Sequence, residues 1–248
     1  MTVSGVLLAF SWLTVLPLHG PDSVDRVSGR RAIRAAPVTG IALGVLAAGV
    51  LWALVSAGLD PALAGLMTVG AHALATRGMH IDGLSDTVDG LGCYGPPERA
   101  RAVMHSGGAG PFGVCALVIC LGAQGLAFGS LAAAGQFACV AVAVAAGRVA
   151  VVFACRRGIP ASSTEGFGAL VAETQSPWTG IAWTVPLLAA AAWCTSPWWQ
   201  GPIVAAVALT LTALLVAHCV RRFAGLNGDV LGAALEITVT VSAIGLTF

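Results

Sequence analysis

The chain has 248 residues, of which 57% are hydrophobic and 9% are charged, and its formal net charge at pH 7 is +1. A soluble domain carries about 25% charged residues, so this composition excludes an ordinary soluble protein and predicts an integral membrane protein. The small net charge says nothing about partners, and we expect no binding to nucleic acid.

Eight apolar stretches follow one another, at positions 3–18, 37–58, 61–78, 111–133, 136–155, 178–195, 201–220 and 229–247. The first is short and ends at Pro17, which predicts a retained interfacial or re-entrant helix rather than a signal peptide. The other seven are long enough to cross a bilayer. Because no repeat or linker divides the chain, we predict one domain over residues 1–248, an all-α polytopic membrane helical bundle with about seven transmembrane helices.

Charged residues alternate with these stretches. Arg26 to Arg34 precede the second stretch, Arg77 to Arg101 precede the fourth, Arg156 to Glu173 follow the fifth, and Arg221 to Asp229 follow the seventh. All charged residues except Asp60 therefore lie on, or within reach of, one side of the predicted bundle. By the positive-inside rule that side is the cytoplasm, which predicts a site on the cytoplasmic face of the membrane.

The cysteines do not form a recognisable framework. They are scattered through mostly apolar runs, without a Cys-x-x-Cys spacing, at Cys93, Cys115, Cys120, Cys139, Cys155, Cys194 and Cys219. This pattern predicts small buried residues and supports neither a set of disulfides nor a zinc site.

The segment from His80 to Gly90 sets three carboxylates in an otherwise apolar chain. Asp82, Asp86 and Asp89 are spaced at i, i+4 and i+7, which places them on one face of a helix. Like charges so close repel unless a cation neutralises them, and oxygen ligands without Cys or His favour Mg²⁺. The alternative is a solvated acidic face. The chain has only 11 acidic residues, and three of them in this short segment beside membrane spans favour a metal site.

A second acidic group lies near the C-terminus. Asp229 and Glu236 are seven residues apart and share a helical face, with Gly232 and Ala233 between them. Asp229 is either the N-cap of an apolar helix or a member of the site. Glu236 lies about two turns inside an apolar run, where a carboxylate must pair or bind something.

Several arginines are candidates for binding phosphate. Arg148 lies inside the apolar run 136–155, where it either forms a structural salt bridge with Glu236 or binds a phosphate group. Arg31 and Arg34 immediately precede a predicted helix on the same side as the three aspartates. Their positive charges primarily indicate which side of the membrane this segment faces, and the side chains can also contact phosphate.

Two motifs together resemble a known family. Gly78 to Gly90 reads G-x-H-x-D-G-L-x-D-x-x-D-G, and Gly225 to Glu236 reads G-x-N-G-D-x-x-G-A-x-x-E. Both are similar to signatures of the cobalamin synthase family, the adenosylcobinamide-GDP ribazoletransferases, with Asn227 in place of a Thr. Weaker matches follow in the family's order over nearly the whole length, at Phe10 to Pro17, at Arg31, Pro37 and Gly40, and at Glu165, Gly166 and Gly168.

The chain departs from the family pattern after Arg99. The family usually has M-[RK]-D-S-R-x-G, whereas Met104 to Gly110 contains neither a carboxylate nor an arginine. We expect Ser106 and the glycine amides of this segment to be able to cradle an oxyanion.

The resemblance implies a late step of cobalamin biosynthesis in a bacterial cytoplasmic membrane. The 3′-hydroxyl of α-ribazole, or of its 5′-phosphate, attacks the cobinamide-linked phosphorus of adenosylcobinamide-GDP, and GMP leaves. Mg²⁺ would be held by Asp82, Asp86 and Asp89, and one of these or Asp229 would orient or deprotonate the hydroxyl. Contacts to substrate or phosphate are expected from Arg31, Arg148, His80, Ser106, Asn227 and Glu236.

The expected partners are the two substrates and membrane lipids. Whether the protein forms a homo-oligomer or assembles with other enzymes of the cobalamin pathway stays open. A CDP-alcohol phosphotransferase is an alternative function, although the Ala-Arg of its D-x-x-D-G-x-x-A-R pattern is missing here. A cation-coupled transporter is another, in which Asp82, Asp86, Asp89, Arg148 and Glu236 would line an ion path. Charge on one side only argues against such a path.

Overall fold

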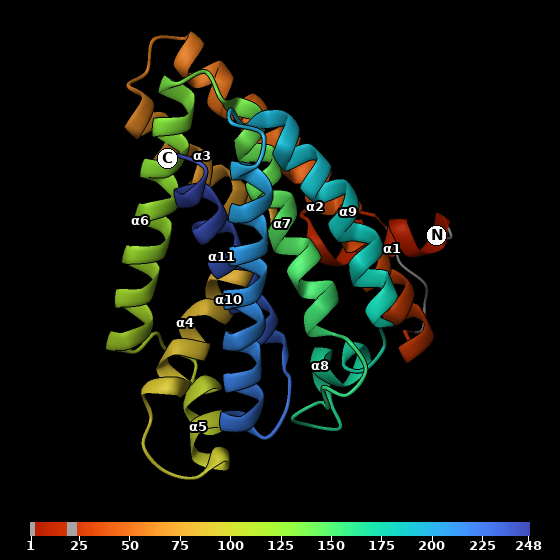
Figure 1. Ribbon diagram of the computed structural model, residues 1–248. Coiled ribbons are helices and arrows are strands. Elements are labelled where there is room, and N and C mark those ends of the chain that lie inside the picture. The colour runs from red at the N-terminus through yellow and green to blue at the C-terminus, as the bar shows by residue number, and fades with distance from the viewer. Residues whose placement is uncertain (1–2, 19–23) are drawn as a thin grey trace.

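The computed structural model describes residues 3–18 and 24–248, and these residues form eleven helices and no strand (Figure 1). The helices are α1 Val3–Leu13, α2 Arg26–Ser56, α3 Pro61–Ala75, α4 Met79–Gly92, α5 Pro97–Met104, α6 Pro111–Ala133, α7 Phe137–Ala154, α8 Gly166–Val171, α9 Pro177–Cys194, α10 Gln200–Phe223 and α11 Gly228–Gly245.

Five helices, α2, α6, α7, α10 and α11, are long and apolar enough to cross a membrane. Helix α9 also runs between the two ends of the bundle (Figure 1). Helix α3 has 15 residues, or about 22 Å, and runs from the end opposite the charged one only part of the way along the bundle, where α4 follows it. The exposed rings of Trp178 and Trp193 lie near opposite ends of α9, as is typical of a helix with an aromatic residue at each membrane interface. The all-α polytopic membrane bundle predicted from the sequence is therefore confirmed.

The N-terminal helix α1 differs from the long helices in length and in direction. Its 11 residues span about 17 Å, against about 30 Å for the hydrocarbon core of a bilayer. Figure 1 shows it lying nearly crosswise to the long helices, and it packs against α2. A short helix of this kind is what the first apolar stretch predicted.

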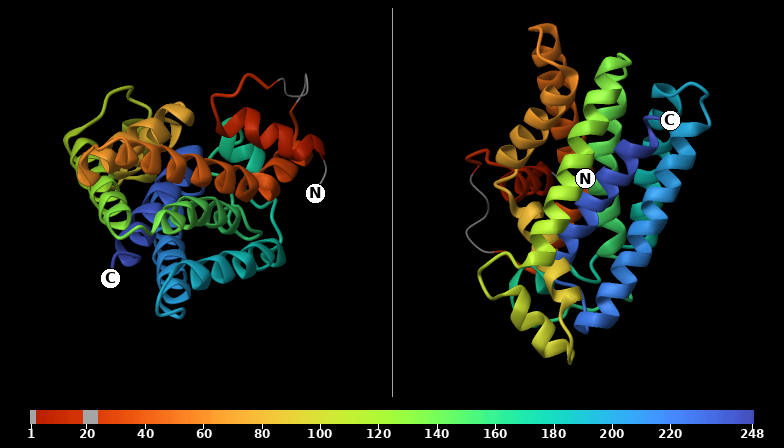
Figure 2. Two further views of the ribbon diagram at one scale, coloured as in Figure 1. Left: turned by 90° about the horizontal axis from the view of Figure 1, so that it is seen from above. Right: turned by 90° about the vertical axis from the view of Figure 1, so that its left-hand side faces the viewer.

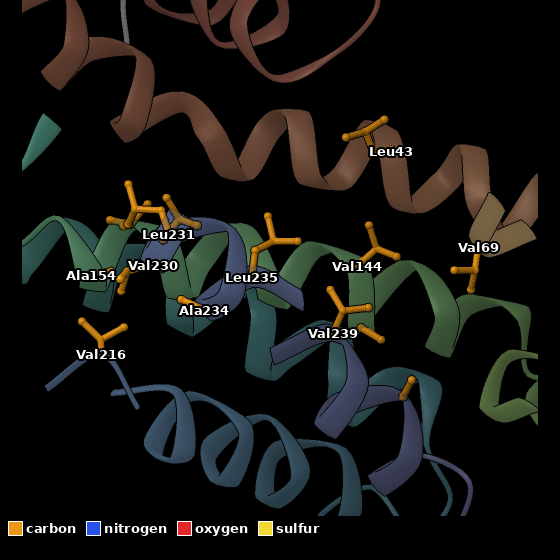
Figure 3. Packing of buried hydrophobic residues seen from close by; sticks show 14 of the residues in the cluster. Leu43, Val69, Val144, Ala154, Val216, Val230, Leu231, Ala234, Leu235 and Val239 are labelled. Carbon is orange, nitrogen blue, oxygen red and sulfur yellow. The ribbon is translucent and has the colours of Figure 1, made fainter. Parts of the chain in front are cut away.

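Helices α7 and α11 form the centre of the bundle. About 67% of each is buried, against 28–39% for the other three candidate spans. Seen from above, the remaining long helices surround these two (Figure 2). Figure 3 shows Leu43 of α2, Val144 of α7, Val216 of α10 and Leu235 of α11 in this core. Since lipid is as apolar as these side chains, close packing rather than burial from water holds the helices together.

Charged residues gather at one end of the bundle, the lower end in Figure 1, where α5, α8 and the start of α11 lie. Asp60 lies at the opposite end and caps α3 by accepting from the amides of Ala62 and Leu63. The one-sided charge read from the sequence is thus a feature of the fold.

One predicted helix start is wrong. Arg31 and Arg34 do not precede α2 but lie within it, because Asp25 caps the helix by accepting from the Ser28 amide at 2.8 Å. The capping aspartate starts the helix before the apolar run that the sequence analysis used as its boundary. The arginines are therefore held on a regular helix.

Candidate active site

Helices α4 and α11 cross at the charged end of the bundle. A Cβ added to Gly83 on α4 would lie 2.8 Å from the carbonyl oxygen of Asp229, and one added to Gly232 on α11 would lie 3.0 Å from the carbonyl oxygen of His80. Only glycine permits backbones to approach so closely. The two glycines therefore bring the acidic turns of α4 against the first turn of α11.

Asp229 is not the cap of α11. The side chain of Asn227 takes that role and accepts from the Val230 amide at 2.9 Å. Capping by Asn227 satisfies a free amide of the first turn. The carboxylate of Asp229 is consequently left to the site, and the interpretation of Asp229 as an N-cap is wrong.

Three carboxylates, those of Asp82, Asp86 and Asp229, share this corner. Burial, and then the charges of Asp82 and Asp229, raise the pKa of the Asp86 carboxyl to about 6. No arginine neutralises the group, since the one ion pair in residues 3–18 and 24–248 joins Arg101 to Glu98. The site therefore concentrates negative charge that a bound cation would relieve.

Asp89 has different surroundings from the other two aspartates of α4. Its carboxylate is buried and accepts from the amides of Gly110 at 2.7 Å and Gly113 at 2.9 Å. Gly110 is the N-cap residue of α6 and Gly113 lies in its first turn, and α6 has no capping side chain of its own. Asp89 thus caps α6 from another helix, where its charge also suits the positive end of the helix dipole.

The described residues contain no group of three or more His, Cys, Asp or Glu side chains arranged to hold a metal ion. The site is therefore not a preformed cage of protein ligands. Mg²⁺ usually keeps several waters and binds one or two carboxylates together with substrate phosphates. The oxygen donors of Asp82, Asp86 and Asp229 fit that chemistry, whereas Asp89 would first have to release the amides of α6.

A cavity of about 810 Å³ opens beside the acidic group, between α1, α2, α4, α7, α8 and α11. Asp82 and Asp229 line one part of its wall. Trp12 and Phe167 line another part, with their rings edge to face and the ring centroids 5.4 Å apart. The cavity thus presents both carboxylates and a wide apolar surface to a ligand.

Arg148 and His80 form a buried polar pair in the lining of this cavity. The Arg148 Nη1 donates to the Nε2 of His80 at 2.8 Å, so the ring proton of a neutral His80 is on Nδ1. Both Arg148 Nη2 and His80 Nδ1 are buried without a hydrogen-bond partner in the described structure. Buried donors normally have acceptors. An unpaired guanidinium donor in the lining of a cavity suits an anion such as a phosphate group.

A second cavity, of about 530 Å³, adjoins the first at Gly228 and Asp229. Arg101, His105 and Asn227 line it. The Nδ1 of His105 lies 2.6 Å from the carbonyl oxygen of Arg101. Because a carbonyl only accepts, Nδ1 carries the proton, and Nε2 of the neutral ring is left as an acceptor.

Three residues predicted for the site lie elsewhere. Glu236 is buried between α11 and α6, where its carboxylate accepts from the side-chain amide of Gln124 at 2.7 Å. The predicted salt bridge between Glu236 and Arg148 does not form, because their side chains bond to Gln124 and His80 instead. Arg31 and Ser106 are exposed, and neither lines the two cavities.

The sequence analysis missed His105 and Arg101 as members of the site. The charge of His105 acts on Asp86 and lowers the pKa of that carboxyl, against the effect of burial. His105 lies in the segment that departs from the family pattern, so the missing acid and arginine could have directed attention to it. Gln124 carried no signal, since a lone Gln in an apolar run has no obvious partner.

The fold and these cavities define a class of protein, a polytopic membrane protein with an acidic, phosphate-compatible site at its charged end. The family model described as cobalamin-5-phosphate synthase matches residues 5–247. The chain therefore belongs to the cobalamin-5-phosphate synthase family, as the sequence motifs predicted.

Several curated relatives carry the name adenosylcobinamide-GDP ribazoletransferase. The protein from Nocardioides sp. is 39% identical to this chain, and the match covers 95% of each chain. The protein from Corynebacterium efficiens is 35% identical over 97% of this chain and 90% of its own length, and that from Bradyrhizobium diazoefficiens is 31% identical over 93% and 88%. No solved structure matches the chain significantly.

Proposed function

We propose that this protein joins adenosylcobinamide-GDP to α-ribazole, or to its 5′-phosphate, late in cobalamin synthesis. Family membership over nearly the whole chain supports this function. The observation that carries the chemistry is the meeting of Asp82, Asp229, Arg148 and His80 in one cavity. Carboxylates suit a metal-bound diphosphate, and buried donors suit a phosphate oxygen. The comparisons do not favour a CDP-alcohol phosphotransferase or a transporter.

In the proposed reaction, the 3′-hydroxyl oxygen of the ribazole forms a bond to the cobinamide-linked phosphorus. The bond from that phosphorus to the oxygen of GMP breaks, and GMP leaves with the electron pair. Arg148 Nη2 and His80 Nδ1 would donate to phosphate oxygens and fix the diphosphate for in-line attack. Asp229, or one of the aspartates of α4, would accept the proton of the hydroxyl.

Mg²⁺ is the cofactor in this proposal. Asp82, Asp86 and Asp229 would hold it, and it would supply positive charge that neutralises the diphosphate and offsets the charge of the departing GMP. What supports the ion is the group of carboxylates without a cationic partner and the raised pKa of Asp86. Asp89 stays a predicted ligand of the ion. Binding the ion would compete with the hydrogen bonds that its carboxylate accepts from the amides at the start of α6.

The arrangement also suits a substrate with a large apolar part. Trp12 and Phe167 supply an apolar wall beside the acidic group, at the charged end of a membrane bundle. A corrinoid could rest against this wall while its diphosphate reaches the polar side. We place this site on the cytoplasmic face of the cytoplasmic membrane, since arginines concentrate at the same end.

The test is release of GMP by the purified protein with adenosylcobinamide-GDP, α-ribazole and Mg²⁺. We expect GMP only when all three are present, and its loss on chelation and recovery on adding Mg²⁺. Asp82→Asn and Asp229→Asn should each lower turnover by about 10–100-fold or more, as removing groups around a metal does. Asp60→Asn is the control, because asparagine also caps a helix and Asp60 lies at the far end of the bundle.

Release of GMP without α-ribazole would contradict the proposed transfer. Full turnover after chelation would contradict the metal. Near-normal turnover of both Asp82→Asn and Asp229→Asn would show that the reaction takes place outside the cavity at the crossing of α4 and α11.

A further inference from the structure

A groove separate from the active site lies between α2, α7 and α9. Its volume is about 240 Å³. Pro37, Ile41 and Val45 line it from α2, and Pro186 and Ala190 line it from α9. Spacing by four residues keeps the α2 side chains on one face. The groove therefore follows α2 for eight residues, or about 12 Å.

A polar mouth lies at the charged end of this groove. A cavity of about 420 Å³ shares Trp183 and Pro186 with the groove and is also lined by Arg34 and Trp178. Arg34 lies one turn before Pro37, nearer the charged start of α2. Trp183 Nε1 donates to the carbonyl oxygen of Arg34 at 2.9 Å and ties α9 to α2 at this point. The groove and its mouth thus run from the membrane interface toward the middle of the bundle.

The lining of the groove favours an acyl chain as its occupant. The side chains along it are apolar or aromatic, and none is charged. The hydrocarbon tail of a lipid suits such a surface. A helix from a second copy of the chain is the alternative that the experiment distinguishes.

The positive charge at the mouth of the groove favours a lipid with an anionic head group. The Arg34 side chain is exposed and forms no ion pair within residues 3–18 and 24–248. Trp178 beside it is 76% exposed, in a position typical of rings at a membrane interface. A guanidinium group binds phosphate well, and interfacial basic residues attract anionic lipids.

We propose that this groove binds one anionic phospholipid, with its phosphate at Arg34 and one acyl chain along Pro37, Ile41 and Val45. The lipid fills the space between α2 and α9, two helices that the structure joins at this end through Trp183 and Arg34. This site shares no lining residue with the two cavities of the active site. The inference is therefore independent of the proposed function.

The test is native mass spectrometry of the full chain in detergent, titrated with phosphatidylglycerol or phosphatidylcholine of the same acyl chains. We expect the protein to bind phosphatidylglycerol more tightly. Arg34→Gln should weaken binding of phosphatidylglycerol about fivefold, to the level of phosphatidylcholine, because one basic residue at the head group is lost. Arg30→Gln is the matched control, since Arg30 is exposed on the same helix but lines neither the groove nor its mouth.

A second pair of variants tests the acyl chain. Ala190→Phe should fill the groove and weaken binding of both lipids, whereas Ala189→Phe, on the same helix but outside the lining, should not. Thermal unfolding of each variant shows whether it is folded. Equal binding by Ala190→Phe and Ala189→Phe, or by Arg34→Gln and Arg30→Gln, would overturn the proposal. A dimer that Ala190→Phe abolishes would also overturn it in favour of a second copy.

Discussion

At the scale of single residues, Asp86 and Asp89 differ more than their spacing suggests. They lie three residues apart on α4, but Asp86 faces other carboxylates, whereas Asp89 faces two backbone amides. A like charge nearby destabilises a carboxylate, and amide donors stabilise it. Replacing the two residues should therefore have opposite effects on stability.

Asp89→Ala should destabilise the protein by about 1–3 kcal/mol, because a half-buried amide and a buried amide at the start of α6 lose their acceptor. Thermal unfolding in detergent measures the effect, and we expect the same loss with and without Mg²⁺. Asp82→Asn is the control and should cost little, since Asp82 is exposed. If Asp89→Ala unfolded like the wild type and only raised the Mg²⁺ requirement, Asp89 would be a ligand rather than a cap.

Asp86→Asn should be more stable than the wild type at pH 8 without divalent cations. The pKa of this carboxyl rises from 3.8 to about 6 on folding, so the folded state binds the proton more tightly. The wild type therefore loses stability relative to the variant as the pH rises from about 4 to 6, and the difference persists above that range. Unfolding midpoints at pH 4 and pH 8 check this sign.

Adding Mg²⁺ provides the control for Asp86→Asn. It should raise the midpoint of the wild type at pH 8 more than that of the variant, because only the wild type has the full set of carboxylates. A variant that is less stable than the wild type at pH 8 would contradict the interpretation of Asp86 as a repelled carboxylate.

At the scale of helices, the parts of the site that are local in sequence were predictable. The acidic spacing predicted α4, and the apolar run after Asn227 predicted α11. Their crossing was not predictable, because it depends on Gly83 and Gly232 meeting across 149 positions of the chain. The contact of Asp89 with α6 is of the same kind. A residue's neighbours on its own helix follow from periodicity, whereas its partners on other helices follow from packing.

Gly83→Ala tests the crossing. The added methyl group would lie 2.8 Å from the Asp229 carbonyl oxygen, so α4 and α11 must move apart. We expect GMP release to fall by about 100-fold, as a displacement of about 1 Å does in a site that depends on position. Gly122→Ala on α6 is the matched control, because nothing lies within 4 Å of its added Cβ.

Gly122→Ala should keep its activity and be slightly more stable, since alanine favours a helix by about 0.8–1.0 kcal/mol over glycine. Circular dichroism and thermal unfolding show whether Gly83→Ala stays folded. Normal turnover by a folded Gly83→Ala would mean that the close approach of α4 to α11 does not position the carboxylates.

At the scale of the whole molecule, the two ends of the bundle differ in charge, and this difference follows from the order of charged and apolar segments in the sequence. The arginines and the proposed site occupy one end, and the other end carries Asp60 with Trp198 and Trp199. The alternation of charged and uncharged connections along the sequence predicted this arrangement. Each membrane crossing reverses the direction of the chain, so every second connection lies at the same end. The cavities themselves could not be read from the sequence, since they arise where six helices leave space.

The final prediction concerns which compartment the site faces. By the positive-inside rule the charged end faces the cytoplasm. None of the cysteines is in a disulfide, so all seven can be replaced, with alanine at the buried Cys120, Cys139, Cys155 and Cys219. In that background, Tyr94→Cys at the charged end and Trp198→Cys at the opposite end supply exposed thiols, because the native side chains are 92% and 70% exposed.

An impermeant maleimide should label Trp198→Cys in intact cells and Tyr94→Cys only in inverted vesicles. GMP release by each variant shows that the fold is kept. Labelling of Tyr94→Cys from outside intact cells would reverse the orientation and place the acidic site away from the cytoplasmic pool of nucleotides and Mg²⁺. Because both thiols are in otherwise identical chains, the labelling of one serves as the accessibility control for the other.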